Sequence, residues 1–112
     1  MIEVGEYVRT NDGEIGTYLG IDTKYEMYDY DVNGNRSSCK YNEVVKHSKN
    51  IIDLIEVGDI VEIYDVLNED VIYIWNEEML KAVKEDVANG IKIRRILTKE
   101  LFEANCYKVK EE

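Results

Sequence analysis

The chain has 112 residues, of which 45% are hydrophobic, and contains no proline. This length accommodates one ordinary domain or two very small ones, and the composition is typical of a globular protein rather than a disordered one. Twenty-four acidic residues against fourteen basic ones leave a formal charge of −10, which argues against binding to nucleic-acid phosphates or anionic membranes, because both attract cationic side chains.

A seven-residue pattern occurs twice, as IEVGEYV at residues 2–8 and as IEVGDIV at residues 55–61. The two copies are 53 positions apart, a period at which repeated sequence indicates repeated structural units. Each copy begins a run of strand and turn signals in the same order. We therefore expect two units, at residues 1–52 and 53–112.

In the first unit, runs of aromatic and β-branched residues, several of them alternating with polar ones, predict strands. These strands lie at residues 7–10, 14–21, 25–32 and 36–41. The turns between them include Asn33-Gly34, a pair that strongly favours a two-residue hairpin. A helical turn over residues 42–45 and a closing strand over residues 49–52 complete the order.

The second unit has the same signals in the same order. Its first four expected strands lie at residues 59–64, 71–75, 79–83 and 91–97. Thr98 is a good N-cap for a short helix through Ala104, which Asn105 can end in the left-handed conformation, and residues 106–109 would form the closing strand. Four strands, a helical turn and a fifth strand are the element order of an SH3-like barrel. We therefore expect a mainly β protein of two small tandem SH3-like barrels that pack together.

Residues 76–90 also fit a different structure. Asn76 could be the N-cap of an amphipathic helix and Gly90 the residue that follows its end. Its apolar stripe would consist of Met79, Leu80, Val83 and Val87. Analogy with the first copy favours strands here, whereas local propensity favours the helix. The alternative fold is therefore α+β with a helix at residues 76–89.

Two parts of the chain resemble known proteins. The segment VGEYVRTNDGEIGTYLGI (residues 4–21) resembles the opening strands of KOW-type and other SH3-like modules. The segments VVKHSKNIIDLIEVGDIV (residues 44–61) and ILTKELFEANCYKV (residues 96–109) are similar to segments of small uncharacterised proteins carried by bacterial phages and prophages. This second resemblance implies a genetic context in which small accessory proteins bind and disable host machinery, anti-CRISPR proteins among them. It carries no catalytic residues over.

Histidine and cysteine, which often carry catalysis or bind metals, are scarce. His47 is the only histidine, and the two cysteines, Cys39 and Cys106, have no CxxC spacing. One histidine cannot build a His-based metal cluster, and a nucleophile needs both a base and a group that orients the base. No phosphate-binding glycine motif is present. We therefore expect no enzymatic activity, no metal and no cofactor, and a cytoplasmic protein with reduced thiols.

Acidic residues are concentrated between Lys49 and Lys81, where no basic residue occurs. A block of one sign can steer a cationic partner and raise its association rate. The alternative is that these acids merely solvate the exterior. The members that we name as candidate contacts to a partner are Asp59, Glu62, Asp65, Glu69, Asp70, Glu77 and Glu78.

A second candidate surface precedes the Asn33-Gly34 hairpin, where tyrosines and acids are interleaved. Tyrosine provides a large contact area with a polar end, and it pairs well with basic partners when acids lie beside it. The alternative is that Tyr28 and Tyr30 belong to the core. The candidate residues are Tyr25, Glu26, Tyr28, Asp29, Tyr30 and Asp31.

These features lead to one main hypothesis and two rivals. The main hypothesis is a non-enzymatic acidic inhibitor of phage or prophage origin. It would block the basic nucleic-acid-binding surface of a host defence protein, such as a CRISPR effector, as an anti-CRISPR or nucleic-acid mimic. One rival is a KOW-like adaptor of nucleic-acid machinery that uses Lys92, Arg94 and Arg95. The other is a protein that sequesters a nucleotide with Lys40, Lys46 and Lys49.

Overall fold

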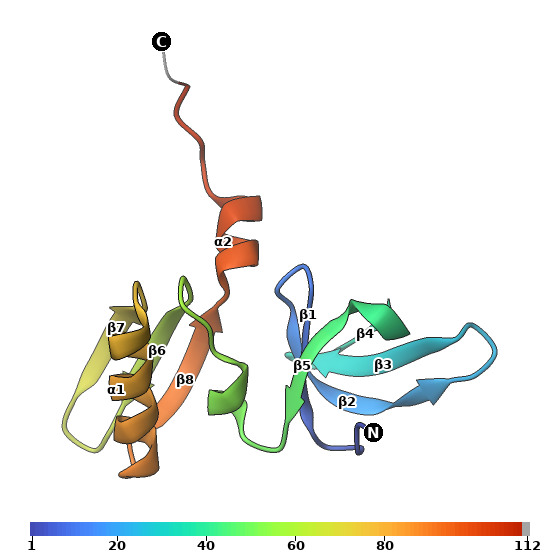
Figure 1. The fold of residues 1–112 in the computed structure, drawn as a ribbon, viewed down its shortest axis with the longest axis horizontal. Coiled ribbons are helices and arrows are strands. Elements are labelled where there is room, and N and C mark those ends of the chain that lie inside the picture. Colours follow the sequence, from blue (N-terminus) through green and yellow to red (C-terminus); the bar gives the residue numbers. More distant parts are fainter. Residues whose placement is uncertain (111–112) are drawn as a thin grey trace. The chain divides into compact units, whose positions relative to one another are not determined.

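The computed structural model describes residues 1–110 and divides the chain into two compact units (Figure 1), Met1–Ile55 and Glu56–Glu112. The boundary lies a little after the one expected from the sequence. The fold is mainly β, as predicted, and contains two antiparallel sheets, neither of which closes into a barrel.

The first unit is a five-stranded sheet in the order β4-β3-β2-β1-β5. Its elements are β1 (Tyr7–Thr10), β2 (Ile15–Asp22), β3 (Met27–Val32), β4 (Asn35–Lys40), the 3-10 turn η1 (Tyr41–Glu43), β5 (Val44–Ser48) and the 3-10 turn η2 (Ile51–Leu54). The order of four strands, a helical turn and a fifth strand is confirmed. The closing strand expected at residues 49–52 is wrong, because the Ser48 hydroxyl donates to Asp53 and accepts from the Asn50 amide, which turns the chain out of the sheet.

The core of the first unit lies on one face of this sheet. Val8, Tyr18, Tyr30 and Cys39 are buried there. Gly16 on β2 makes room for this packing, because a Cβ at that position would lie 2.7 Å from both the Asp31 carbonyl oxygen and a carbon of the Tyr30 ring. The aromatic side chains of β2 and β3 therefore fill the core.

The second unit is a three-stranded sheet with two helices. Its elements are β6 (Ile60–Tyr64), β7 (Glu69–Tyr73), α1 (Glu77–Ala88), β8 (Lys92–Leu97) and α2 (Lys99–Asn105), and the sheet order is β7-β6-β8. The expected strands at residues 79–83 and 106–109 are wrong within the part of the chain that the structure describes. The first is part of α1, and the second has no regular structure.

The alternative reading of residues 76–89 as a helix is confirmed. The Asn76 side chain accepts a hydrogen bond from the Met79 amide, which satisfies a donor at the helix start. Leu80 and Val83 are buried, and Gly90 has a φ of 106° just beyond the end. These local signals prevailed over the analogy with the first copy. The short helix after Thr98 is also confirmed, but it ends with Cys106 in an extended conformation rather than with a left-handed Asn105.

The repeated pattern forms a turn that precedes the first strand of each unit. In the first copy Gly5 has a φ of 97°, and the Glu6 amide donates to the Glu3 carbonyl over 3.0 Å. The Glu6 carboxylate in turn accepts the Glu3 amide at 2.5 Å. The turn is tied to the second strand, because the Gly5 amide donates to the Tyr18 carbonyl and the Tyr18 amide donates to the Glu6 carbonyl.

The second copy makes the same bonds at the corresponding positions. Gly58 has a φ of 101°, and the Asp59 amide donates to the Glu56 carbonyl over 3.1 Å. The Asp59 carboxylate accepts the Glu56 amide at 2.8 Å. Gly58 and Asp59 exchange backbone bonds with Ile74, the counterpart of Tyr18. The sequence repeats here because glycine is needed at positive φ and an acid is needed to accept the first amide.

The correspondence extends to three strands. The strands β2, β1 and β5 of the first unit match β7, β6 and β8 of the second, with β1 and β6 central in both. The pairing with the last strand is interrupted by an irregularity at the same place, after Arg9 in β1 and after Glu62 in β6. Along the chain of the first unit, β3 and β4 lie between β2 and β5. Along the chain of the second unit, α1 lies between β7 and β8.

Candidate functional site

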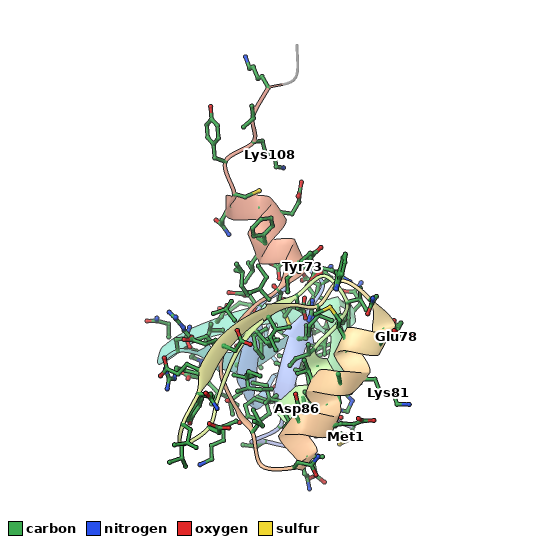
Figure 2. All side chains as sticks on the ribbon, turned by 90° about the vertical axis from the view of Figure 1, so that its left-hand side faces the viewer. Met1, Tyr73, Glu78, Lys81, Asp86 and Lys108 are labelled. Carbon is green, nitrogen blue, oxygen red and sulfur yellow. The ribbon has the colours of Figure 1, made fainter. Side chains whose placement is uncertain are left out.

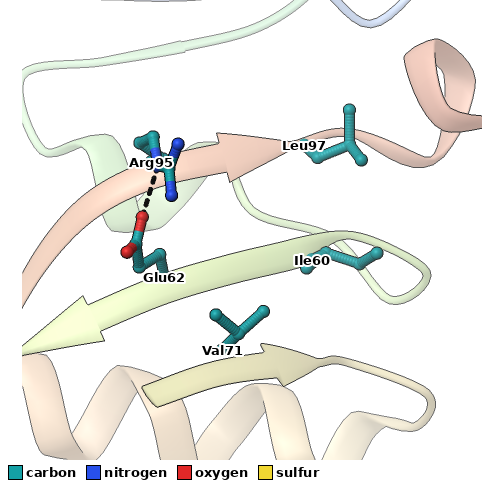
Figure 3. A pocket seen from close by; sticks show the side chains of 5 residues that line it. All are labelled: Ile60, Glu62, Val71, Arg95 and Leu97. Atoms are coloured by element: carbon teal, nitrogen blue, oxygen red, sulfur yellow. Dashed lines mark hydrogen bonds and ion pairs between the residues drawn. The ribbon is translucent and has the colours of Figure 1, made fainter. Parts of the chain in front are cut away.

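The sheet of the second unit has one covered face and one open face. Val61 and Ile63 of β6 are buried, as are Leu80 and Val83 of α1. Because strand residues alternate between faces, Ile60, Glu62 and Tyr64 lie on the opposite face. An open hollow of about 140 Å³ lies there, lined by side chains from all three strands (Figure 3). They belong to Ile60, Glu62, Val71, Arg95 and Leu97. We call this surface the outer face of the second unit.

One half of the outer face is apolar. Tyr73 and Leu97 both pair with Ile60 in the sheet register, and Val71 pairs with the neighbouring Glu62. Val71 is 63% exposed, Tyr73 57% and Leu97 40%. Large apolar side chains exposed singly are ordinary, but a contiguous group on one face is typical of a surface that binds something.

The other half of the outer face is a network of charged side chains. Arg95 donates from Nε to Glu62 Oε2, and this hydrogen bond holds the pKa of Glu62 below its usual value, so that the carboxylate stays charged. Arg94 pairs with Glu69 at 2.7 Å, and its guanidinium lies 4.4 Å from the centre of the Tyr64 ring. Two arginines from β8 therefore face two acids from β6 and β7.

This network neutralises two acids of the block between Lys49 and Lys81. The stretch between Lys49 and Lys81 has no base in the sequence, but β8 places Arg94 and Arg95 against Glu62 and Glu69. Lys99 likewise pairs with Glu56 at 2.7 Å. The base-free stretch of sequence therefore does not form a base-free surface on the outer face, because β8 places two arginines against its acids.

Asp59, the first of the candidate acids, is wrongly placed on a binding surface. Its side chain is 0% exposed, and its carboxylate accepts the Glu56 and Lys99 amides. Asp65 is exposed, but its carboxylate closes the connection between β6 and β7 by accepting the amides of Leu67 and Asn68. Asp59 is therefore buried and stabilises the fold, whereas Asp65 is exposed and also stabilises a turn.

The three remaining acids are open to solvent. The Asp70 carboxylate accepts the amide of Val71 at 2.9 Å. Glu77 and Glu78 lie in the first turn of α1 (Figure 2), where negative charge is favourable because of the helix dipole. These three residues are still available for contact with a partner.

The tyrosine-rich candidate surface is largely internal. Tyr30 is 2% exposed, and its hydroxyl donates to Glu14 at 2.5 Å. Burial, followed by the bond to Glu14, raises the pKa of Tyr30 far above its usual value. The proposal that Tyr30 contacts a partner is therefore wrong, and the alternative that it belongs to the core is right. Tyr28 is half-buried between the rings of Tyr18 and Tyr41.

Asp29 is also buried rather than available. Arg36 donates to one of its oxygens at 2.5 Å and Ser38 to the other at 2.7 Å, and the Arg36 bond is the main cause of its lowered pKa. Asp31 is half-buried and accepts the Gly34 amide in the hairpin. Only Tyr25 and Glu26 of the six candidates are fully exposed. They do not form an extended patch with their four neighbours.

The apolar residues of the outer face are not recognisable as one group from local sequence patterns. The signal was present in the alternation of IVEIY at residues 60–64, which places Ile60, Glu62 and Tyr64 on one side. Finding Val71 and Leu97 beside them required knowing that β7 and β8 both pair with β6. The order of the sequence signals places residues 91–97 fourth, whereas in the structure β8 corresponds to the fifth strand of the first unit, β5, and pairs with β6.

Metal-binding clusters and membrane-spanning helices are absent from the described residues. Within residues 1–110, no three His, Cys, Asp or Glu side chains are gathered closely enough to bind a metal ion. Among the helices of the same residues, none is both long and apolar enough to span a membrane. No protein-family model, curated protein or solved structure matches the chain.

Proposed function

We propose that this chain is a non-enzymatic protein-binding module that contacts its partner through the outer face of the second unit. The observation that carries the proposal is the exposed apolar group of Val71, Tyr73 and Leu97 beside an ordered pair of Glu62 and Arg95. Protein interfaces combine an apolar centre with a polar border, and tyrosine and arginine are enriched among their energetically important residues.

A narrower form of this proposal names the partner as a basic surface. The net charge of −10 supports it, as does the exposure of Asp70, Glu77 and Glu78 in the same unit. Such charges raise the association rate with a cationic partner. The partner would be a nucleic-acid-binding host defence protein, such as a CRISPR effector, and the chain a phage-type inhibitor in the bacterial cytoplasm.

The architecture suits a binding role. We infer that the first unit is an open relative of the SH3-like barrel, on the basis of its strand order β4-β3-β2-β1-β5 and of the 3-10 turn η1 before the last strand. The binding role itself is carried by the outer face, because one architecture hosts many functions.

The rival functions have less support from the contacts. An adaptor that binds nucleic acid through β8 would need the guanidinium groups of Arg94 and Arg95, which are engaged by Glu69 and Glu62. A nucleotide site built on Lys40, Lys46 and Lys49 would have to compete with Glu3, which pairs with Lys49 at 3.1 Å.

The test compares two matched double variants in a tagged pull-down from bacterial lysate. Val71→Gln with Leu97→Gln removes apolar contact from the outer face without changing the net charge. The control, Leu19→Gln with Ile21→Gln, changes two similarly exposed aliphatic residues of β2 in the first unit. Circular dichroism checks that both variants are folded.

We expect the wild-type chain and the β2 control to recover the same partner, and the outer-face variant to lose it. Recovery of the partner with equal yield by all three proteins would refute the proposed surface. The salt dependence of recovery tests the narrower form, because binding driven by opposite charges weakens as the ionic strength rises.

A further inference from the structure

The internal repeat indicates what the outer face of the second unit receives. In the first unit the corresponding face of the three-strand core is covered. The turn η2 packs on β1 and β5, and Arg9 Nη1 donates to the Leu54 carbonyl over 2.8 Å. Arg9 and Leu54 are both fully buried. A single helical turn rich in aliphatic residues therefore packs over β1 and β5 on this face in the first copy.

The second unit has the same three strands without that cover. Its last strand, β8, is also followed by a helix, but Figure 1 shows α2 continuing beyond the end of β8 instead of turning back over the sheet. Val71, Tyr73 and Leu97 consequently stay exposed. The second copy therefore has an open hollow of about 140 Å³ on this face, and no turn from the end of β8 lies over it.

The central polar residue differs between the two copies. Arg9 in β1 corresponds to Glu62 in β6, because each immediately precedes the irregularity in pairing with the last strand. Arg9 donates to a carbonyl of the turn above it, whereas a carboxylate can only accept. The Glu62 carboxylate already accepts from Arg95, but its two oxygens offer further acceptor sites to a segment above it. A basic side chain is the strongest donor for those sites.

We propose that the outer face of the second unit binds a short helical turn of a protein partner, with aliphatic side chains and a neighbouring Lys or Arg. The aliphatic residues lie on Ile60, Val71 and Leu97, and the cation meets Glu62. This inference rests on the proposed function and deepens it by naming the kind of segment recognised. A basic flank also agrees with the acidic charge of the chain.

The chain itself supplies a suitable probe. Residues 49–55, KNIIDLI, contain the aliphatic turn η2 preceded by a lysine. A synthetic peptide of this sequence is titrated into the isotope-labelled full chain while backbone amide shifts are followed by NMR. A control peptide has serine in place of Ile51, Ile52 and Leu54.

We expect saturable shifts at Ile60, Glu62, Val71 and Leu97 with the first peptide and none with the control. Glu62→Gln should weaken binding about three- to tenfold, as expected for the loss of one charge-assisted bond. Shifts confined to β1 and β5 would mean that the peptide merely exchanges with η2, and would overturn the inference.

The result is separable from the test of the proposed function. If the natural partner depends on Val71 and Leu97 but the peptide gives no saturable shifts, the named segment is wrong and the binding surface stands. If the partner is recovered equally by the outer-face variant, and the peptide also fails to bind, both proposals are refuted.

Discussion

The buried carboxylate of Asp59 gives the sharpest prediction for stability. It is 0% exposed and accepts two backbone amides, those of Glu56 at 2.8 Å and Lys99 at 3.0 Å. One amide lies in the turn before the first strand of the second unit, and the other lies just after its last strand. Asp59→Ala would leave both donors without this partner in a part of the molecule with limited access to water.

The expected cost follows from the number of donors. An unsatisfied buried donor costs about 1–3 kcal/mol, and both amides here are only partly buried, so about 2–4 kcal/mol in total is expected for Asp59→Ala. Asp59→Asn should cost less, because its carbonyl oxygen can still accept one amide. Asp70→Ala is the matched control, since Asp70 is exposed and accepts only the amide that follows it, and it should change stability by less than about 0.5 kcal/mol.

Urea unfolding followed by circular dichroism measures these differences. The single tryptophan, Trp75, lies directly after β7 and adds a fluorescence signal from the second unit. An unfolding free energy for Asp59→Ala within about 0.5 kcal/mol of the wild-type value would show that the carboxylate is not needed to hold the turn. The structural explanation of the repeated sequence would then be wrong.

Three further predictions concern the first unit and the turns. Gly5→Ala and Gly58→Ala should each lower the unfolding free energy measured in urea by about 1–2 kcal/mol, because both glycines have a positive φ. Gly58→Ala should be the more destabilising of the two, since its Cβ would also lie 3.1 Å from the Lys99 side chain. Equal stability of the wild type and the variants would contradict this. Gly16→Ala should lower the melting temperature more than either, because its Cβ would meet backbone and ring atoms at 2.7 Å. The hydrogen bond from His47 is the main cause of the lowered pKa of Glu6, so the stability that Glu6 contributes is present above its usual pKa of 4.5 and is lost as the pH falls below that value. Glu6→Gln should flatten the dependence of unfolding free energy on pH in this acidic range, and an unchanged slope would show that the pair is not formed.

Much of the first unit could be predicted from local sequence. The Asn33-Gly34 pair forms the hairpin between β3 and β4, with both residues at positive φ, because those residues tolerate that conformation. In the second unit, the N-cap of α2 could also be predicted from local sequence. The Thr98 hydroxyl accepts a hydrogen bond from the Leu101 amide, as expected for an N-cap. Signals of this kind act over a few residues and need no knowledge of the rest of the chain.

The errors came from reasoning by analogy across the repeat. The turn and three strands are shared, but the inserted part is not, so the first copy wrongly suggested a strand where Asn76 caps a helix. Residues 91–97 were then matched to the wrong strand. The neutralisation of Glu62 could not be predicted for a related reason, because only the pairing of β8 with β6 brings Arg95 to it. Alternation alone also could not show that Tyr30 lies on the covered face of β3.

In each unit an ion pair also joins the repeated turn to a lysine just after the last strand. In the first unit Lys49, just after β5, pairs with Glu3 before β1, and in the second Lys99, just after β8, pairs with Glu56 before β6. A module whose entry and exit are adjacent can be excised, duplicated in tandem or inserted into another protein's loop without stretching either host or guest. In the first unit, the same adjacency allows the two ends to be joined by a short linker, while new termini are opened at the exposed β3–β4 hairpin. The adjacent ends of each three-strand core are therefore compatible with a tandem arrangement of two copies.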